Sequence, residues 1–463
     1  DLPLASPESV GMSTKRLERV KAYMQDYIDT NQIAGSVTLI ARKGKIVHYE
    51  AQGWRDKEAQ QTMPRDAIFT LMSMTKPIVS TALMMLWEDG KFLLDDPISK
   101  WLPSYANKQV LVEGQLVRPL RPVTVRHVLT HTSGLSLEPP PTGAPTQGQG
   151  QARPRPTTLG EAIERAAPIP LAFHPGDRWQ YGASTDYVGI LVEKISGMEY
   201  EKYLLDNILK PLGITTPNPV NPSAEMVELM ALPYNAGGPT GKPVPVSQVH
   251  FDVYPAGDIY LTAEDMARFL GVHVNGGVFR GRRILSEASV KAMHEPQFGG
   301  SYGFGFSVKK GENGHTIISH SGGIPGQSSQ MVGDVDAHVG VYYMSNSGAP
   351  PSIAEAALKL LRGEDYAPAP ERKAIAVDPA VLDRYVGVYE VGELTFTVTR
   401  QGAGLTVVQG DSPERTELLA ESPTRFFMKG QDFTITFEAG PAGAIDKMVI
   451  DTGPSRLEAK KRK

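Results

Sequence analysis

The spacing of apolar residues near the N-terminus predicts a helix followed by a β-hairpin. Apolar side chains recur every three or four positions over residues 13–30, which is the period of an amphipathic helix. Two runs with strand-like composition follow at residues 36–42 and 45–50, joined at Lys43-Gly44. A glycine-containing link of this length between two such runs indicates a hairpin.

The next segment, residues 77–89, is apolar on nearly all sides and is followed by Gly90. Its length and its terminal glycine predict a helix, and a helix without a polar face is normally buried in a core. Ser73 lies at or just before the expected first turn. Lys76, three residues later, shares a helix face with Ser73.

Later patterning places helices in the middle of the chain and strands near its end. A capping-box pattern at Thr262-Ala263-Glu264-Asp265 indicates a helix start. Other helices are expected at 123–129, 185–196 and 352–361, and strands at 302–309, 315–320, 327–334 and 338–345. We therefore predict an α+β fold. Its mixed antiparallel sheet is built from both chain ends and flanked by helices, with a helical region inserted at about residues 75–290.

Loops and linkers divide the chain further. Residues 138–157 and roughly 215–250 are rich in proline and glycine and predict long loops. The first unit is expected to span residues 1–365 and a linker residues 366–378. Beyond it, residues 379–463 alternate between apolar and polar positions and are interrupted by turns, which predicts a small all-β barrel or sandwich.

Composition and charge limit the number of domains, the kinds of partner and the cellular location to be expected. The 463 residues suffice for two or three domains, and a net charge of −4 gives no indication of nucleic-acid binding. The absence of cysteine excludes disulfides and agrees with a periplasmic or secreted location, although a cytoplasmic one stays open. No apolar run approaches about 18 residues, so no membrane span is expected. The first residue is Asp1, which leaves both a removed leader and a trimmed sequence open.

Ser73 and Lys76 are candidates for nucleophilic catalysis. A serine hydroxyl becomes a good nucleophile only when a base takes its proton. A buried lysine can be that base because desolvation disfavours its charged form, and the positive end of the helix dipole lies beside any oxyanion that forms. The alternative is that Ser73 is an ordinary helix cap.

A second Ser-x-x-Lys occurs at Ser307 to Lys310, inside an alternating stretch. Residues i and i+3 of a strand point to opposite faces. Ser307 and Lys310 are therefore interpreted as surface strand residues that cannot act together.

Two other patterns resemble functional motifs and are interpreted as structural. Gly299 to Gly303 matches G-x-S-x-G, but a nucleophile elbow needs a strand before it and a helix after it, and a loop precedes this one. His127 and His131 have the spacing of a helical metal pair. They lack the glutamate of H-E-x-x-H, so hydrogen-bonded structural histidines are favoured over zinc ligands.

Three motifs occur in a fixed order along the chain: Ser73-x-x-Lys76, then Tyr181-Gly182-Ala183, then His320-Ser321-Gly322-Gly323. Over roughly residues 8–362 this order resembles the serine β-lactamase and penicillin-binding-protein superfamily, whose first signature is S-x-x-K. The spacing is most similar to class C β-lactamases, related D-alanyl-D-alanine carboxypeptidases and family VIII carboxylesterases. The tail is similar to the lipocalin-like domain often appended to such hydrolases. Supporting matches are Leu129 to Leu135, His174-Pro175-Gly176, Trp179-Gln180-Tyr181 and Lys210 to Gly213.

The resemblance implies roles for these residues. Ser73 would be acylated, and Lys76 and Tyr181 would share the proton transfers. The oxyanion hole would consist of the backbone N–H groups of Ser73 and of Gly323, just past the strand motif. His320, Ser321, Gly322 and Ala183 would contact the substrate. A rim position for Tyr181 and a purely structural His320 are the alternatives.

Two departures bear on the substrate. Ala183 stands where class C β-lactamases carry an asparagine that binds the substrate amide, and His320 stands where they carry a lysine that favours a carboxylate. Both changes favour a serine carboxylesterase acting on short-chain esters, with weak β-lactam hydrolysis. The alternatives are a D-amino-acid-specific peptidase or carboxypeptidase, a class C-like β-lactamase, and a non-catalytic binding protein. The expected partner is a small-molecule ester. No metal or organic cofactor is expected, and oligomeric state is left open.

Overall fold

The computed structural model describes residues 2–30, 32–137, 158–217, 219–220, 222, 226, 229–234, 255–311, 314–324, 326–348, 353–362, 374–391, 394–410, 415–428, 434–440, 443–451 and 456–462. The chain divides into two compact units. The first comprises Asp1–Gly348 and Ser352–Glu364, and the second comprises Ala349–Pro351 and Asp365–Lys463. The predicted loop at 138–157 lies outside the described residues, as does most of 215–250.

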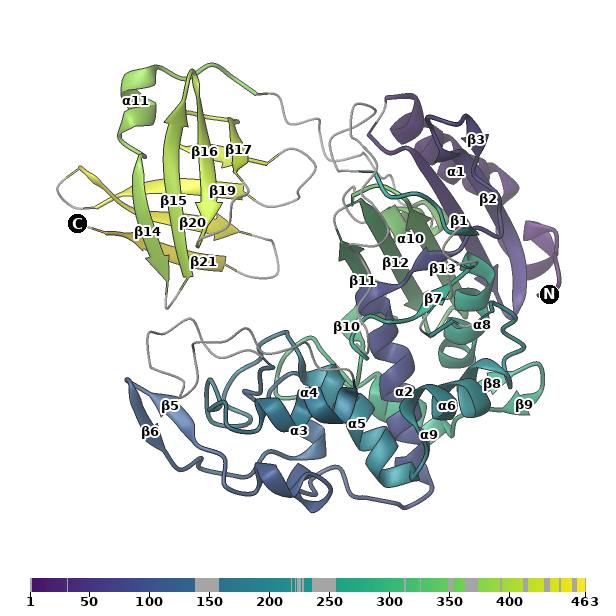
Figure 1. The fold of residues 1–463 in the computed structure, drawn as a ribbon. Coiled ribbons are helices and arrows are strands. Elements are labelled where there is room, and N and C mark those ends of the chain that lie inside the picture. The colour runs from purple at the N-terminus through teal and green to yellow at the C-terminus, as the bar shows by residue number, and fades with distance from the viewer. Residues whose placement is uncertain are drawn as a thin grey trace. The chain divides into compact units, whose positions relative to one another are not determined.

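The first unit is built on a seven-stranded antiparallel sheet (Figure 1). Its order is β10-β11-β12-β13-β1-β2-β3, so the N-terminal hairpin pairs with the last strand of the C-terminal meander. The bounds are β1 Gly35–Arg42, β2 Lys45–Asp56, β3 Gln61–Thr62, β10 Ser307–Lys310, β11 Thr316–Ile324, β12 Gln327–Asp334 and β13 Val339–Ser345. The predicted α+β fold with a sheet made from both chain ends is confirmed.

Some strand boundaries differ from the sequence-based expectations. The first strand of the meander covers residues 307–310 rather than 302–309, because Gly305, with φ +80, interrupts the extended backbone before it. In contrast, β11 continues to Ile324, whereas the apolar alternation ends near residue 320. Gly322 and Gly323 have no side chain and so add nothing to the alternation of apolar and polar residues. The extension of β11 to Ile324 therefore could not be predicted from that alternation.

Helices cover the sheet. The terminal helices α1 Thr14–Asp29 and α10 Ile353–Arg362 pack together, and α8 Ala263–Val274 packs on β1, β12 and β13 (Figure 1). Strand β13 is buried at every residue, as expected for a strand that contacts both α8 and α10. Thr262 caps α8 by accepting a hydrogen bond from the backbone N–H of Asp265, which confirms the predicted capping box.

The inserted region contains the buried helix α2 Thr75–Glu88, which packs against α5 Ser184–Ser196. The other helices of this region are α3 Val125–Leu129, α4 Leu159–Ala166, α6 Tyr200–Leu204 and α9 Glu287–Met293. Three short strand pairs complete it: β4 Phe69–Thr70 with β7 Tyr260–Leu261, β5 Val110–Val112 with β6 Gln115–Val117, and β8 Val278–Phe279 with β9 Arg282–Arg283. No helix in the described ranges is long and apolar enough to span a membrane.

The second unit is a closed barrel of eight strands, preceded by α11 Pro379–Asp383. The strands are β14 Gly387–Val391, β15 Leu394–Gln401, β16 Gly404–Gln409, β17 Thr416–Ala420, β18 Arg425–Phe427, β19 Thr434–Ala439, β20 Ile445–Asp451 and β21 Arg456–Lys461. Its interior is an apolar cluster centred on Tyr385, Phe426 and Phe437, whose rings stack or meet edge to face. The predicted barrel is confirmed.

Candidate active site

Ser73 lies in a short 3-10 turn, Met72–Met74, that leads directly into α2. The turn is fixed from two sides. The N–H of Leu71 donates to the carbonyl of Ile259 at 2.8 Å, and β4 pairs with β7 just before it. Met72 has φ +48, a left-handed conformation that is strained for a side chain of this size. The surrounding packing therefore holds Ser73 at the N-terminus of a buried helix, next to the positive end of the helix dipole.

Lys76 is buried, with 2% of its surface exposed. Its Nζ atom donates to Ser73 Oγ at 3.0 Å and to the carbonyl of Ala256 at 3.0 Å. Burial lowers the pKa of Lys76 to about 8, while the nearby Asp186 carboxylate acts in the opposite direction. A lysine that titrates near neutrality and contacts the serine hydroxyl has the geometry and the proton affinity of a general base.

The ring of Tyr181 covers the Lys76 ammonium. Nζ lies 4.8 Å from the ring centroid, within the range of a cation–π contact. The Tyr181 ring also stacks on the ring of His131, with 4.7 Å between the ring centroids, and its centroid lies 6.1 Å from that of Trp179. Tyr181 keeps 41% of its surface exposed, so it is both a neighbour of the base and part of the site's open rim.

Ser73 and Tyr181 line a pocket with a volume of about 520 Å³. The walls come from the sheet, from the segment before α5 and from the loop before β10. None of the described residues that line it is charged. They are Ser73, Trp179, Tyr181, Tyr302, Ser307, Ser319, His320, Ser321, Gly323, Gln330, Met331 and Val332.

Strand β11 supplies one wall because its outer edge is open there. β10 pairs only with Thr316–Ser319, whereas β12 pairs with β11 as far as Ile324. The backbone of residues 320–324 therefore has a strand on one side only within the described sheet. Gly323, which follows the motif His320-Ser321-Gly322 directly, lies within β11 and lines the pocket. Its position agrees with the predicted use of its N–H in an oxyanion hole, which stays a prediction.

Gly322 brings β11 close to the turn that contains Ser73. A Cβ atom at this position would lie 2.0 Å from the carbonyl oxygen of Leu71, so only glycine fits. Gly322 is buried against that turn and does not line the pocket. Ala183 is the N-cap of α5 and also is not among the lining residues. The substrate contacts predicted for both residues stay predictions.

His320 is held in a single neutral form. Its Nδ1 lies 2.7 Å from the carbonyl oxygen of Ser321, which can only accept, so Nδ1 carries the proton. Nε2 is then an acceptor, and the hydroxyl of Tyr302 donates to it at 3.2 Å. Burial, followed by the charge of Lys76, lowers the pKa of His320 to about 3. The position that the sequence suggested for an optional charge is therefore uncharged at neutral pH.

His131 and Tyr302 are members of the site that the sequence did not indicate. His131 lies beneath Tyr181 and meets Tyr302 edge to face at 5.2 Å. Burial lowers the pKa of His131 well below its usual value, and Lys76 acts in the same direction. Tyr302 belongs to the G-x-S-x-G stretch that was rejected as an elbow. That stretch is a loop followed by β10, so the rejection is confirmed, yet the stretch supplies a wall of the pocket.

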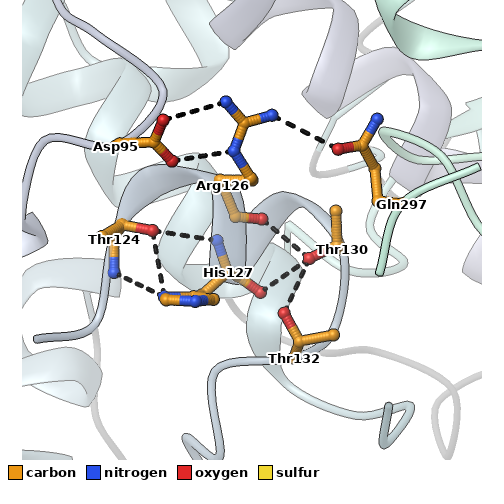
Figure 2. Close-up of polar contacts among 7 residues, drawn as sticks. All are labelled: Asp95, Thr124, Arg126, His127, Thr130, Thr132 and Gln297. Atoms are coloured by element: carbon orange, nitrogen blue, oxygen red, sulfur yellow. Dashed lines mark hydrogen bonds and ion pairs between the residues drawn. The ribbon is translucent and has the colours of Figure 1, made fainter. Parts of the chain in front are cut away.

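His127 has a different task, shown in Figure 2. Its Nδ1 lies 3.1 Å from the backbone N–H of Thr124, and its own backbone N–H donates to Thr124 Oγ1, which closes a capping box at the start of α3. The neighbouring Arg126 forms a bidentate ion pair with Asp95. The structural role favoured for His127 over a zinc ligand agrees with this geometry. The described residues contain no cluster of three or more metal-ligating side chains.

The sequence matches the Beta-lactamase family over residues 20–364. The chain belongs to the beta-lactamase family. The predicted membership of the β-lactamase and penicillin-binding-protein superfamily is thus confirmed. Residues 371–462, which form most of the barrel unit, match a domain of unknown function, DUF3471.

Proteins that are similar to this chain carry different names. The esterase EstB of Burkholderia gladioli is 33% identical over 307 residues, which cover 61% of this chain and 74% of EstB. A penicillin-binding protein of Bacillus subtilis is 26% identical over 476 residues, covering 96% of this chain and 98% of the relative. The solved structure of EstCE1, a hydrolase with promiscuous acyltransferase activity, matches with a TM-score of 0.59 and 26% identity, over 72% of this chain and 94% of EstCE1.

Proposed function

We propose that this protein is a serine carboxylesterase that hydrolyses short-chain, uncharged esters through an acyl-enzyme at Ser73. The observation that carries the proposal is the 3.0 Å contact between Lys76 Nζ and Ser73 Oγ beside a pocket whose described lining residues are uncharged. The similarity to EstB supports an esterase over a peptidase, because that relative is named an esterase.

Acylation would begin with neutral Lys76. As Ser73 Oγ attacks the ester carbonyl carbon, its proton moves to Lys76 Nζ, and the carbonyl oxygen takes the negative charge. The N–H groups of Ser73 and Gly323 would stabilise that oxyanion. Collapse of the tetrahedral intermediate breaks the bond to the leaving alkoxide, which takes the proton back from Lys76, directly or through Tyr181. The products of this half-reaction are the alcohol and the Ser73 ester.

Deacylation would repeat these transfers with water in place of serine. Lys76 takes a proton from the water, the hydroxide adds to the acyl carbon, and the collapse returns the proton to Ser73 Oγ. An ester suits this site better than an amide because an alkoxide leaves with less help than an amine. Only one base and one short proton path are then required.

The neutral state of His320 supports selection against carboxylates. A carboxylate that enters a pocket without a positive partner loses its hydration and gains no ion pair. The Nδ1–H of His320 already donates to Ser321, and its Nε2 already accepts from Tyr302, so neither nitrogen has a proton to offer a carboxylate. An uncharged acyl or alcohol group avoids this penalty.

The test is a paired assay of the full chain and its Ser73→Ala variant. One arm uses p-nitrophenyl butyrate, and the other uses a chromogenic cephalosporin, which carries a carboxylate. We expect ester turnover that falls at least about 1,000-fold in Ser73→Ala, and a much slower β-lactam reaction. Full esterase activity in Ser73→Ala would contradict the proposal, and so would a cephalosporin rate equal to the ester rate.

His320→Lys tests the origin of the selectivity. A lysine at this position places a flexible cation in the pocket, so the ratio of cephalosporin to ester kcat/KM is expected to rise about tenfold. His320→Gln, which adds no charge, is the matched control and should leave the ratio within about twofold of the wild type. An equal rise in both variants would mean that the ring's size, rather than its charge, excludes carboxylates.

A further inference from the structure

Asp186 is a buried acid next to the catalytic base. It lies in the first turn of α5, five residues after Tyr181, with 1% of its surface exposed. One oxygen, Oδ1, accepts a hydrogen bond from the backbone N–H of Ala256 at 3.0 Å. The other, Oδ2, has no hydrogen-bond partner among the described residues.

Ala256 connects this acid to Lys76. Its N–H is held by Asp186, and its carbonyl oxygen accepts from Lys76 Nζ at 3.0 Å. Lys76 Nζ is thus located by two acceptors, Ser73 Oγ and the Ala256 carbonyl, and the second of these is itself fixed by Asp186. Movement of the 255–258 segment would move one of the two contacts that aim the amine at Ser73.

We propose that Asp186 is a positioning residue for Lys76: it anchors the Ala256 carbonyl and supplies the negative charge that keeps the lysine a strong enough base to take the Ser73 proton. The proposal rests on the proposed function, because it assumes that Ser73 is the nucleophile. It assigns Asp186 an indirect role, since no described contact joins Asp186 to Ser73 or to the pocket lining.

The charges around Lys76 single out Asp186. His131 and His320 also face the lysine, and burial lowers the pKa of both, so they are neutral and cannot offset its charge. Tyr181 contributes its ring face. Among the described residues that act on Lys76, Asp186 is the one acid whose charge raises the lysine pKa.

The environment of Asp186 itself agrees with a paired role. Burial raises its pKa to about 7, against the Ala256 hydrogen bond and the Lys76 charge, which both lower it. The neighbouring hydroxyls of Tyr187 and Tyr200 are buried and neutral, because burial raises the pKa of both. A carboxylate close to a buried ammonium offsets its charge, and this keeps net charge out of the core.

A substitution that removes the charge of Asp186 but keeps its hydrogen bond distinguishes the proposed role from a purely structural one. An asparagine at position 186 would accept the same hydrogen bond from Ala256 through its amide oxygen, without the charge. If Asp186 only anchors the backbone, Asp186→Asn leaves the base unaffected. If the charge matters, the same substitution lowers the pKa of Lys76 and weakens it as a base.

The experiment follows the rate of Ser73 labelling by a fluorophosphonate as a function of pH, in the full chain. Labelling needs only the nucleophile and its base, so it does not depend on the natural substrate. In the wild type the rate should rise as pH increases through the lysine pKa, because only neutral Lys76 accepts the serine proton. For Asp186→Asn we expect this rise to move about one pH unit lower, and the high-pH plateau to fall about tenfold.

Asp258→Asn is the matched control. Asp258 is also buried, at 4% exposure, and accepts from the hydroxyl of Tyr200 at 3.2 Å rather than holding Ala256. Its pH profile should coincide with that of the wild type. Asp186→Ala removes both charge and anchor, so its plateau should fall further, about 100-fold. Should Asp186→Asn not fold, Asp186→Ser replaces it with the same expected shift.

The outcomes separate the two proposals. A wild type that is not labelled at Ser73 overturns the proposed function. A labelled wild type whose pH profile is unchanged in Asp186→Asn overturns the role of Asp186 and leaves the proposed function intact. An equal shift in Asp258→Asn also overturns it, because the effect would then come from general loss of buried charge.

Discussion

The chain contains Ser-x-x-Lys twice, and the two copies adopt different secondary structures. At Ser73 the four residues cross a 3-10 turn into a helix, and Lys76 Nζ meets Ser73 Oγ at 3.0 Å inside the protein. At Ser307 they form the whole of strand β10, where both ends are exposed and Lys310 Nζ instead donates to Thr316 on the next strand at 2.8 Å. The same four-residue pattern therefore becomes a candidate catalytic pair only when a helical turn aligns it and burial lowers the lysine pKa.

Replacing each lysine with methionine is expected to give the largest difference between the copies. Lys76→Met removes the base and should lower ester kcat/KM by about 1,000-fold, whereas Lys310→Met should leave it within about twofold. Comparable losses in both variants, measured with p-nitrophenyl butyrate, would contradict the assignment of the base to the helical copy.

The same two variants should differ in stability, in the direction opposite to activity. Lys76 has a pKa of about 8 in the folded chain against an ordinary 10.5, so the unfolded state binds its proton more tightly. The buried charge therefore costs stability below about pH 8, and that cost disappears as pH rises towards 10.5. Lys76→Met should raise Tm at pH 7 by about 3 °C, and Lys310→Met should not. The gain in Lys76→Met should vanish near pH 10.

A smaller effect is expected at the strand that faces the helical copy. Gly322→Ala places a methyl group 2.0 Å from the Leu71 carbonyl, so β11 and the Ser73 turn must move apart. We expect a loss of about 2 kcal/mol in the free energy of unfolding and about tenfold in kcat/KM.

Gly323→Ala is the matched control for this substitution. Its nearest neighbour would be the carbonyl oxygen of Gln327 at 3.8 Å, so thermal unfolding should be nearly unchanged. Equal destabilisation in both variants would mean that β11 tolerates no side chain here for a reason other than its approach to Leu71.

The order of elements and several site residues could be predicted before the structure. The all-apolar segment after Ser73 forms α2, and the alternating runs at both chain ends meet in one sheet. The alternation of apolar and polar residues did not predict the end of β11, because glycine carries no such signal. β11 runs through Gly322 and Gly323, which have no side chain to mark a face, so the strand that lines the pocket extends further than the pattern indicated.

His127 and His131, whose spacing resembles that of a metal pair, show why the rest could be found only from the tertiary structure. His127 and His131 are four residues apart, yet His127 closes the cap of α3 while His131, with φ +57, lies just past the end of that helix and places its ring beneath Tyr181. Both are buried, as expected for structural histidines. Nothing in the local sequence distinguishes them, because the distinction depends on Tyr181 and Tyr302, which are distant in the chain.

The sequence by itself determined the family and the strand and helix order, and it predicted Ser73, Lys76 and Tyr181 as candidate site residues, because these depend on local periodicity and on motifs in a fixed order. Only the tertiary structure decided the charge of the site. The neutral His320 between Ser321 and Tyr302, and the buried Asp186 that holds Ala256 beside Lys76, depend on hydrogen bonds and on desolvation by distant segments. Protonation follows from what surrounds a group in space, and no spacing along the chain encodes that.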